Sequence, residues 1–351
     1  MVLHDSTARF SRSRLTRGVS FTSLFAAIGL VLTGCASPAS PDAQEQMRVV
    51  ATTTQLADFT SAVVGNDGIV TGLILPNASA HQFDPSAKNL LDVGEAQALV
   101  ANGAGLEPWL QDLMDAGAFS GDLIVATDGI VLEEGNHAHA DEPVGEEATA
   151  DESHAGEVTD ATDPHAWTAP QNAIAMVNNI ASGLSKVRPD LAERFAMNAA
   201  AYVEKLTLLD SWATEAFASV ALEKRLLITN HDALGYFVDA YDITYVGSIM
   251  PSLDDNAEPS AQEIDALIAK IKDVGATAVF SENSLSDKLA TTIAREAGVA
   301  VYSGEQSLYA DSLGAEGTSG ATYLDATIHN VTVLVTAWDG TVPPLPEGLT
   351  A

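Results

Sequence analysis

The sequence predicts an α/β fold of two lobes, each a mainly parallel sheet flanked by helices, joined by one long backbone helix. Short apolar and β-branched segments alternate with segments of helical period, first over residues 48–125 and again over residues 226–338. Between the two series, residues 191–220 carry one unbroken helical pattern, which at 1.5 Å per residue would be about 45 Å long. A chain of 351 residues has room for two lobes.

The first lobe is expected to alternate four strands with helices. Clusters of β-branched and apolar residues predict strands at residues 48–54, 69–75, 98–100 and 123–125. Apolar residues spaced three or four apart predict helices at residues 55–64, from 86 onward, after 109 and at 174–187. In parallel sheets, ligands bind beyond the carboxyl ends of the strands, and His81 follows the second strand.

The connecting helix and the second lobe follow the same logic. In residues 191–220, apolar side chains share one face at spacings of three and four, at Phe195, Ala199, Tyr202, Leu206, Leu209 and Ala213. The second series predicts strands at 226–229, 243–246, 276–280 and 299–302, and helices after 230 and at 261–272, 286–297 and 323–338. His231 lies where the first of these strands ends, and Asp311 lies in a loop on the matching edge.

Residues 1–34 have the layout of a signal peptide. An uncharged, mostly apolar run at 19–32, too short for a comfortable bilayer span, follows a basic stretch with Arg9, Arg12, Arg14 and Arg17. Small residues precede Cys35 as in a bacterial lipobox, so we expect cleavage before Cys35 and its lipidation. A plain secreted protein with an incidental cysteine is the alternative. Residues 35–47 would then form a flexible tether.

Charge and cysteine content exclude several classes of protein. Loss of residues 1–34 removes four arginines and one aspartate, so 12 basic and 47 acidic residues remain, a net charge of −35. Such a surface repels nucleic acid and anionic membranes and attracts cations. Because Cys35 is the only cysteine, the chain has no internal disulfide and no thiolate metal cluster. We expect a monomer that binds no nucleic acid.

Residues 133–163 interrupt the alternation with an acidic insert. The insert has almost no large apolar side chains and neither Lys nor Arg, so nothing in its composition favours a packed structure. Its three histidines, His137, His139 and His154, could capture metal weakly. The alternative is a solvated acidic loop whose histidines are incidental.

Four residues in loops are candidate metal ligands, namely His81, His165, His231 and Asp311. Their separations of 84, 66 and 80 residues are far outside zinc-finger spacing, so their shared place on the ligand-binding edge carries the argument. Pro164 stiffens the turn that presents His165. Three imidazoles and one carboxylate suit zinc first, with manganese or another first-row ion as the alternative. Four protein ligands leave no open coordination position, which favours holding an ion over catalysis, and we assign no catalytic residue.

The motifs around these residues resemble the metal-binding lipoproteins of bacterial ABC importers, of the zinc-type ZnuA/TroA-like family, over about residues 48–340. His81-Gln82-Phe83-Asp84-Pro85 is close to the family's His-Glu-Tyr-Glu-Pro. Residues 163–167 match its Asp-Pro-His-x-Trp in full. Residues 230–237 look like the histidine version of its third ligand motif, and Asp311 matches its C-terminal acid. Residues 102–109 resemble its Asn-Gly-x-Gly-x-Glu-x-Trp turn.

The resemblance implies an extracytoplasmic, membrane-anchored protein that captures Zn²⁺, or alternatively Mn²⁺, between two lobes and delivers it to the permease of an ABC importer. The expected organisation is an N-terminal lobe at 48–189, a linking helix at 190–220 and a C-terminal lobe at 221–351. In this family a third histidine is more often associated with zinc, and so is a histidine-rich insert before the second ligand. The insert of this chain departs from that pattern, because it is acidic and has only three histidines.

Two rival classes stay open. A zinc-dependent hydrolase is disfavoured because the sequence has no His-Glu-x-x-His or Gly-x-Ser-x-Gly motif. An adhesin or structural lipoprotein would hold its metal for stability alone. Asp232 and Glu258 are candidates for orienting the ligands, although Asp232 could instead cap the following helix. We interpret His329, within the last helix, as structural.

Overall fold

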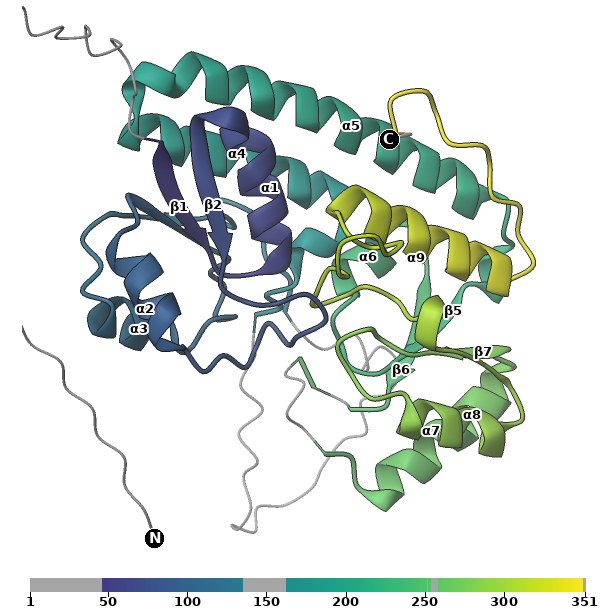
Figure 1. Ribbon diagram of the computed structural model, residues 1–351. Coiled ribbons are helices and arrows are strands. Elements are labelled where there is room, and N and C mark those ends of the chain that lie inside the picture. The colour runs from purple at the N-terminus through teal and green to yellow at the C-terminus, as the bar shows by residue number, and fades with distance from the viewer. Residues whose placement is uncertain (1–45, 135–161, 251, 254–257, 350–351) are drawn as a thin grey trace, which may run out of the picture. The chain divides into compact units, whose positions relative to one another are not determined.

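The structure is a computed structural model that describes residues 46–134, 162–250, 252–253 and 258–349, all within one compact unit that comprises Glu45–Ala351 (Figure 1). The expected signal peptide, the lipidation site Cys35 and the tether up to residue 45 lie outside the described residues, as do His137, His139 and His154.

The first sheet has four parallel strands in the order β2-β1-β3-β4. They are β1 (Met47–Ala51), β2 (Gly68–Gly72), β3 (Ala98–Ala101) and β4 (Asp122–Val125). Alternate residues of a strand face opposite sides of the sheet, so Val49 packs in the core on one face and Val50 in the core on the other. Helix α1 (Thr54–Val64) covers the first face. Helices α2 (Ala87–Gly94) and α3 (Leu110–Ala116) cover the second.

Two helices follow the acidic insert, α4 (Pro170–Val187) and the long helix α5 (Ala192–Ala218). Figure 1 shows α5 beside α4, passing over α1 and over the last helix, α9 (Tyr323–Ala337). Helix α5 has 27 residues, slightly fewer than the pattern predicts. It begins one residue later than predicted because Pro189–Leu191 forms a 3₁₀ turn before it, and it ends two residues earlier, at Ala218.

The second lobe has parallel strands, as predicted, but they pair as two two-stranded sheets. Strand β5 (Leu226–Thr229) pairs with β6 (Thr244–Ser248), and β7 (Ala278–Phe280) pairs with β8 (Ala300–Tyr302). Beyond the ends of β5 and β7, Asn230 and Glu282 exchange side-chain-to-backbone hydrogen bonds of 2.9 and 3.1 Å. These side chains take the place of a backbone ladder between the two strands at that end. The helices of this lobe are α6 (Gly235–Ala240), α7 (Ala261–Val274) and α8 (Lys288–Ala297).

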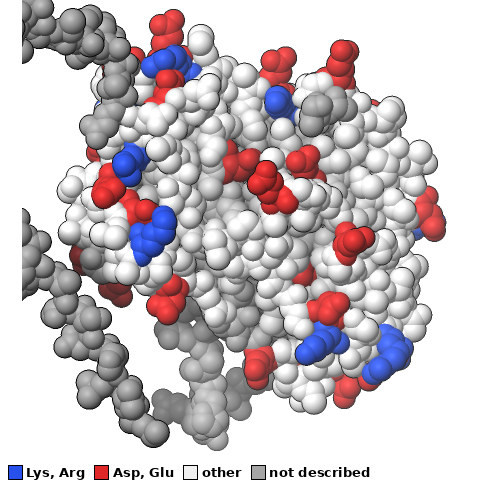
Figure 2. Space-filling model, viewed as in Figure 1, with Lys and Arg blue, Asp and Glu red and all other residues white. Residues whose placement is uncertain are grey.

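The surface reflects the acidic composition. Figure 2 shows red carboxylate side chains spread over the viewed face, with fewer blue basic ones between them. None of the helices in the described part of the chain is long and apolar enough to cross a bilayer.

Candidate metal centre

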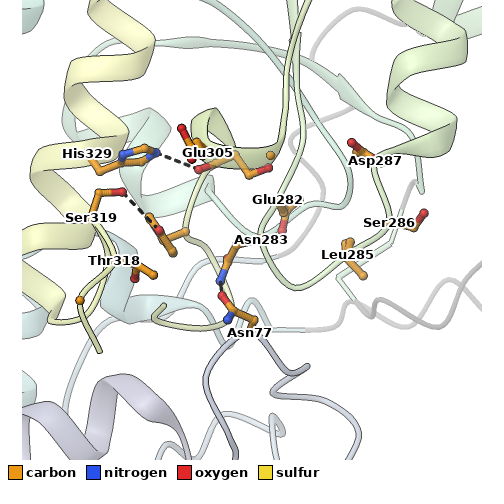
Figure 3. Close-up of a pocket in the computed structure, with 14 residues that line it drawn as sticks. Asn77, Glu282, Asn283, Leu285, Ser286, Asp287, Glu305, Thr318, Ser319 and His329 are labelled. Carbon is orange, nitrogen blue, oxygen red and sulfur yellow. Dashed lines mark hydrogen bonds between the residues drawn. The ribbon is translucent and has the colours of Figure 1, made fainter. Parts of the chain in front are cut away.

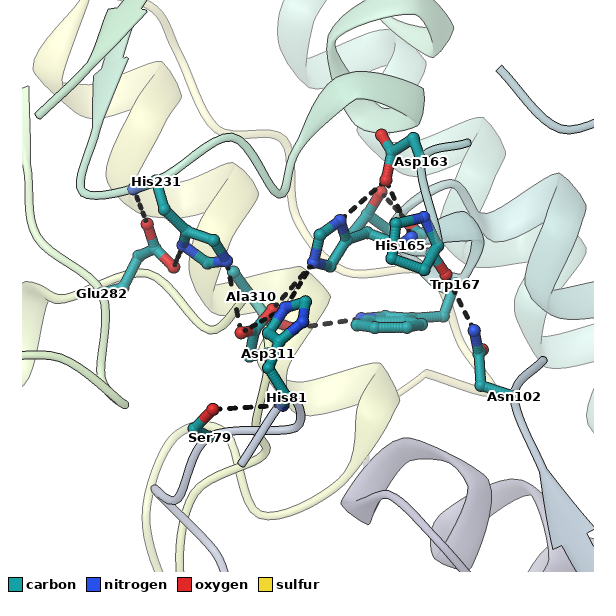
Figure 4. A network of polar contacts seen from close by, with 12 residues as sticks. Ser79, His81, Asn102, Asp163, His165, Trp167, His231, Glu282, Ala310 and Asp311 are labelled. Carbon is teal, nitrogen blue, oxygen red and sulfur yellow. Dashed lines mark hydrogen bonds and ion pairs between the residues drawn. The ribbon is translucent and has the colours of Figure 1, made fainter. Parts of the chain in front are cut away.

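The four candidate ligands come together in space although they lie far apart in the chain. One donor atom from each of His81, His165, His231 and Asp311 lies within 4.8 Å of the others. Each residue comes from a different loop: after β2, before α4, after β5, and between β8 and α9 (Figure 4). Their placement beyond the strand ends is that expected of ligand sites in parallel sheets.

Each of the three imidazoles presents the same nitrogen to Asp311. Nε2 of His81 lies 3.4 Å from one carboxylate oxygen of Asp311, and Nε2 of His231 lies 3.2 Å from that same oxygen. Nε2 of His165 lies 3.4 Å from the other oxygen and 3.1 Å from Nε2 of His81. Despite these approaches, neither oxygen of Asp311 has a well-aligned hydrogen bond from the described residues. A buried carboxylate without such donors, facing three imidazole nitrogens, is a donor set that fits a cation.

Carboxylates behind the imidazoles fix the orientation of two rings. Oδ1 of Asp163 lies 2.7 Å from Nδ1 of His165 and accepts a hydrogen bond from the backbone N–H of the same residue at 2.9 Å. Oε2 of Glu282 lies 2.8 Å from Nδ1 of His231, and its other oxygen accepts from the backbone N–H of His231 at 3.0 Å. A proton on each Nδ1 leaves each Nε2 with a free lone pair for a metal ion.

Glu282 is a functional residue that sequence reasoning missed, since it lies 51 positions from His231 in the sequence. Its placement directly after β7, on the edge that carries the ligands, is the signal that could have found it. Glu258, by contrast, is exposed. Asp232 is buried, and helix α6 begins after Leu234 with no side-chain cap. The expectation that Asp232 caps this helix is therefore wrong.

The residues in the Asn-Gly-x-Gly-x-Glu-x-Trp turn support the backbone behind His165. Nδ2 of Asn102 donates to the backbone carbonyl of Pro164 at 2.9 Å. Oε1 of Glu107 accepts from the backbone N–H of Asn102 at 2.7 Å and from the hydroxyl of Thr52 at 2.6 Å. Burial raises the pKa of Glu107, and these hydrogen bonds to its carboxylate oppose that rise.

The aromatic anchor Trp167 ties the His165 segment to the loop of Asp311. Its indole N–H donates to the backbone carbonyl of Ala310 at 3.0 Å, and its ring meets the imidazole of His165 edge to face. From α1, the side chain of Gln55 donates to the same carbonyl at 2.9 Å. Contacts from the first lobe therefore help to position Asp311, in addition to the contacts that its own lobe provides.

Burial and charge make the centre strongly coupled. The side chains of His165, His231 and Asp311 are fully buried, whereas that of His81 is 9% exposed. Burial disfavours the charged imidazolium of His231, but the carboxylates of Glu282 and Asp311 outweigh burial and raise its pKa well above the usual 6.5. Burial of Asp311 is likewise outweighed by the histidines, which hold the pKa of its carboxyl well below 3.8.

The remaining histidine of the described chain lies apart from this cluster. His329 is in α9, where Nε2 lies 3.0 Å from the backbone carbonyl of Ser307 and burial lowers the pKa of the imidazole. This contact agrees with the structural role predicted for it.

Comparisons with known proteins point to one group of metal-binding proteins. A family model described as zinc-uptake complex component A, periplasmic (ZnuA), matches residues 49–337. The zinc-binding protein AdcA of Streptococcus pyogenes is 34% identical over 263 residues, which make up 73% of this chain and 50% of that protein. The manganese-binding lipoprotein MntA of Halalkalibacterium halodurans is 27% identical over 322 residues, 90% of this chain and 97% of that one. The chain thus spans about half the length of the AdcA relatives.

Solved structures show the same fold. The periplasmic zinc-binding protein TroA of Treponema pallidum superposes with a TM-score of 0.69 at 24% identity, covering 84% of this chain and 99% of that one. A manganese-bound mutant of a periplasmic metal-binding protein from Candidatus Liberibacter asiaticus has a TM-score of 0.69 at 22% identity, over 84% and 100% of the two chains. The expected two-lobed α/β architecture with a long connecting helix is confirmed.

Proposed function

The chain belongs to the ZnuA family of periplasmic components of zinc-uptake complexes, and we propose that it captures Zn²⁺ outside the cytoplasm and delivers it to the permease of an ABC importer. The observation that carries this proposal is the buried cluster of three imidazoles and one carboxylate. In this function His81, His165, His231 and Asp311 are the metal ligands, and the ion is cargo. Asp163 and Glu282 orient two of the histidines.

Zinc is preferred over manganese in this proposal because nitrogen donors dominate the site. Imidazole suits zinc, whereas manganese is better served by carboxylate, carbonyl and water oxygens. Relatives named for each metal exist, since AdcA is a zinc-binding protein and MntA a manganese-binding lipoprotein. A manganese carrier is therefore the alternative within the same role.

The proposed place of action is the outer side of the cell membrane, with a lipid on Cys35 as the anchor. MntA and the AdcA protein of Streptococcus pneumoniae are both named lipoproteins, which supports this anchor. The proposed organisation is the expected one: lobes at residues 48–189 and 221–351, a linking helix at 190–220, and a tether at 35–47, the last residue of which, Met47, already belongs to β1. The protein would act as a monomer.

We propose binding rather than catalysis because four protein ligands leave no coordination position open for water or substrate. Catalytic zinc sites usually combine three protein ligands with an open position for water. A zinc hydrolase would need one of the four residues for turnover but not for binding. An adhesin that uses metal only for stability would not exchange its ion without unfolding.

The deciding experiment is a competitive Zn²⁺ and Mn²⁺ titration of the soluble form that starts at Ala36. His231→Ala removes one proposed ligand, and His329→Ala is the matched control, because that histidine lies in α9 outside the cluster. Deletion of residues 136–158 tests whether the acidic insert, with His137, His139 and His154, takes part in capture.

We expect one tight zinc ion per chain, weakened by His231→Ala but not by His329→Ala, and hardly changed by the deletion. Preference for manganese would keep the importer function and overturn the metal. Failure to bind either ion, or unchanged binding without His231, would overturn the site.

A further inference from the structure

His81 is the ligand through which the centre meets solvent. Its side chain is 9% exposed, whereas those of His165, His231 and Asp311 are fully buried. An ion that enters or leaves must therefore pass His81. This histidine lies on the loop of residues 73–86, between β2 and α2.

The His81 loop is tied to the second lobe by Asn77. Its backbone N–H donates to the carbonyl of Leu313 at 3.0 Å, and its side-chain oxygen accepts from Nδ2 of Asn283 at 3.0 Å. The same Nδ2 also donates to the carbonyl of Ser312 at 3.1 Å. We call the side-chain hydrogen bond between Asn283 and Asn77 the asparagine clasp.

The clasp, together with the hydrogen bond from Asn283 to Ser312, joins two segments that carry proposed ligands and a third that supports a ligand. Asn77 lies four residues before His81, Ser312 directly follows Asp311, and Asn283 directly follows Glu282, the carboxylate behind His231. Loss of the side-chain amide of Asn283 would therefore disturb the segments that position three of the ligands. The remaining ligand, His165, is positioned separately by Asp163 and Asn102.

Water can reach the clasp. Asn77 and Asn283 both line an open cavity of about 820 Å³, whose other lining residues come from the second lobe, and Figure 3 shows their two side chains meeting. A hydrogen bond at a wet surface can exchange its partners for water at little cost. The contact between His231 and Glu282 is fully buried and has no such route.

We propose that the asparagine clasp is a latch that sets how long the bound ion stays. When the clasp is closed, the loop holds His81 against the other ligands. When water replaces the clasp, the loop keeps only the backbone hydrogen bond from Asn77 to Leu313 as its tie at this point, and His81 can leave the ion more easily. Asn77 and Asn283 are thus positioning residues, and this inference rests on the proposed function.

The backbone at Asn77 allows a clean test, because its φ of +62° lies in the left-handed region. Asn77→Gly tolerates that conformation and deletes only the side chain. Asn77→Asp keeps an oxygen that can accept from Asn283. Ala118→Gly is the matched control, since Ala118 also has a positive φ, +51°, but lies in the turn after α3 away from the clasp.

The measurement is the rate of zinc release into an excess of a chromophoric chelator, followed by stopped flow, beside the melting temperature of each metal-free variant. One neutral hydrogen bond corresponds to roughly a two- to tenfold change in a rate constant. We expect Asn77→Gly to release zinc about two- to tenfold faster than the unchanged protein, with no change in the metal-free melting temperature beyond that of Ala118→Gly. Asn77→Asp should release it at close to the original rate.

Because aspartate also adds a charge, Asn77→Asp is compared with Asn77→Asp combined with Asn283→Ala, which keeps the charge and loses the clasp. The combined variant should release zinc faster. Equal release by Asn77→Gly and the unchanged protein would overturn the latch, and so would an equal acceleration by Ala118→Gly. Such a result would leave the proposed function intact as long as the unchanged protein binds zinc and His81→Ala weakens that binding.

Discussion

Two buried carboxylates set the chemistry of the centre at the scale of single residues. Asp163 accepts from the backbone N–H of His165 and lies 2.7 Å from Nδ1 of its ring. Glu282 accepts from the backbone N–H of His231 and makes a 2.8 Å charge contact with Nδ1 of its ring. Each carboxylate thus contacts both the backbone and the ring of one histidine, and a proton on Nδ1 directs Nε2 toward the shared site. The motif around His165 carries its own supporting acid, but Glu282 is brought to His231 only by the folding of β7 next to β5.

Replacement of Glu282 by Gln should weaken zinc binding about 10- to 100-fold, the range typical of residues that support a metal ligand. The side-chain NH₂ of Gln cannot accept a hydrogen bond, yet it would have to face either the backbone N–H groups of Asn230 and His231 or the ring of His231. Glu305→Gln, at an exposed position of the same lobe, is the control and should bind as tightly as the unchanged protein. Equal affinities of the two variants, measured by chelator competition, would contradict the assigned role of Glu282.

Zinc affinity should fall as the pH is lowered, and the fall should begin above about pH 6.5, the usual imidazole pKa. The reason is that the pKa of His231 is raised in the metal-free protein. Its imidazole therefore keeps its proton to higher pH, and it must lose that proton to bind a metal. Dissociation constants measured between about pH 5 and pH 8 test this. Constant affinity across that range would show that no imidazole of the cluster loses a proton on binding.

At the scale of secondary structure, the alternation of strand and helix could be read from the sequence because each element carries its own pattern. Val49 and Val50 face opposite cores, as the two-residue period of a strand requires. The split of the second lobe into two sheets could not be read in this way. The contact that links β5 to β7 beyond their ends is between Asn230 and Glu282, which are 52 residues apart and leave no local signal.

Helix α5 is attached to both lobes through a partly buried carboxylate, that of Asp58 on α1. Oδ2 of Asp58 accepts from the hydroxyl of Tyr202 in α5 at 2.7 Å and from the backbone N–H of Tyr323 in α9 at 3.1 Å. Burial raises the pKa of Asp58, and these two hydrogen bonds oppose that rise. The side chain of Asp58 thus links the three helices α1, α5 and α9.

Tyr202→Phe should lower the free energy of unfolding by about 0.5–1.5 kcal/mol, because it leaves the partly buried Asp58 with one donor fewer. Thr207→Ala, on the exposed side of the same helix, is the control and should change stability by less than about 0.5 kcal/mol. Urea denaturation of the metal-free proteins gives both values. A loss no larger for Tyr202→Phe than for Thr207→Ala would mean that Asp58 does not depend on this hydroxyl.

At the scale of the whole molecule, the centre joins residues of both lobes, so a bound ion stabilises the complete fold. Zinc in excess of its dissociation constant should raise the melting temperature, since an ion that binds only the folded chain adds its binding free energy to the free energy of unfolding. Asp311→Ala should abolish most of this rise, whereas His329→Ala should preserve it. Calorimetry with zinc and with a chelator measures the difference.

The rise in melting temperature that zinc causes should also become larger as the pH increases. A pKa of His231 that is higher in the folded than in the unfolded chain stabilises the metal-free protein fully below about pH 6.5, and this contribution is lost as the pH rises through the folded value. Zinc binding, which needs the neutral ring, strengthens over the same interval. A melting-temperature gain that shrinks as the pH rises would contradict this coupling.

The spread of the ligands along the chain, from His81 to Asp311, determines when during synthesis and folding the metal site becomes complete. A polypeptide still being made or translocated has no complete site until residue 311 has emerged and both lobes have closed around it. Partial chains can offer isolated imidazoles, but not the enclosed set of four. We therefore expect tight zinc binding only by a chain that has finished folding, so that bound zinc would mark the mature protein.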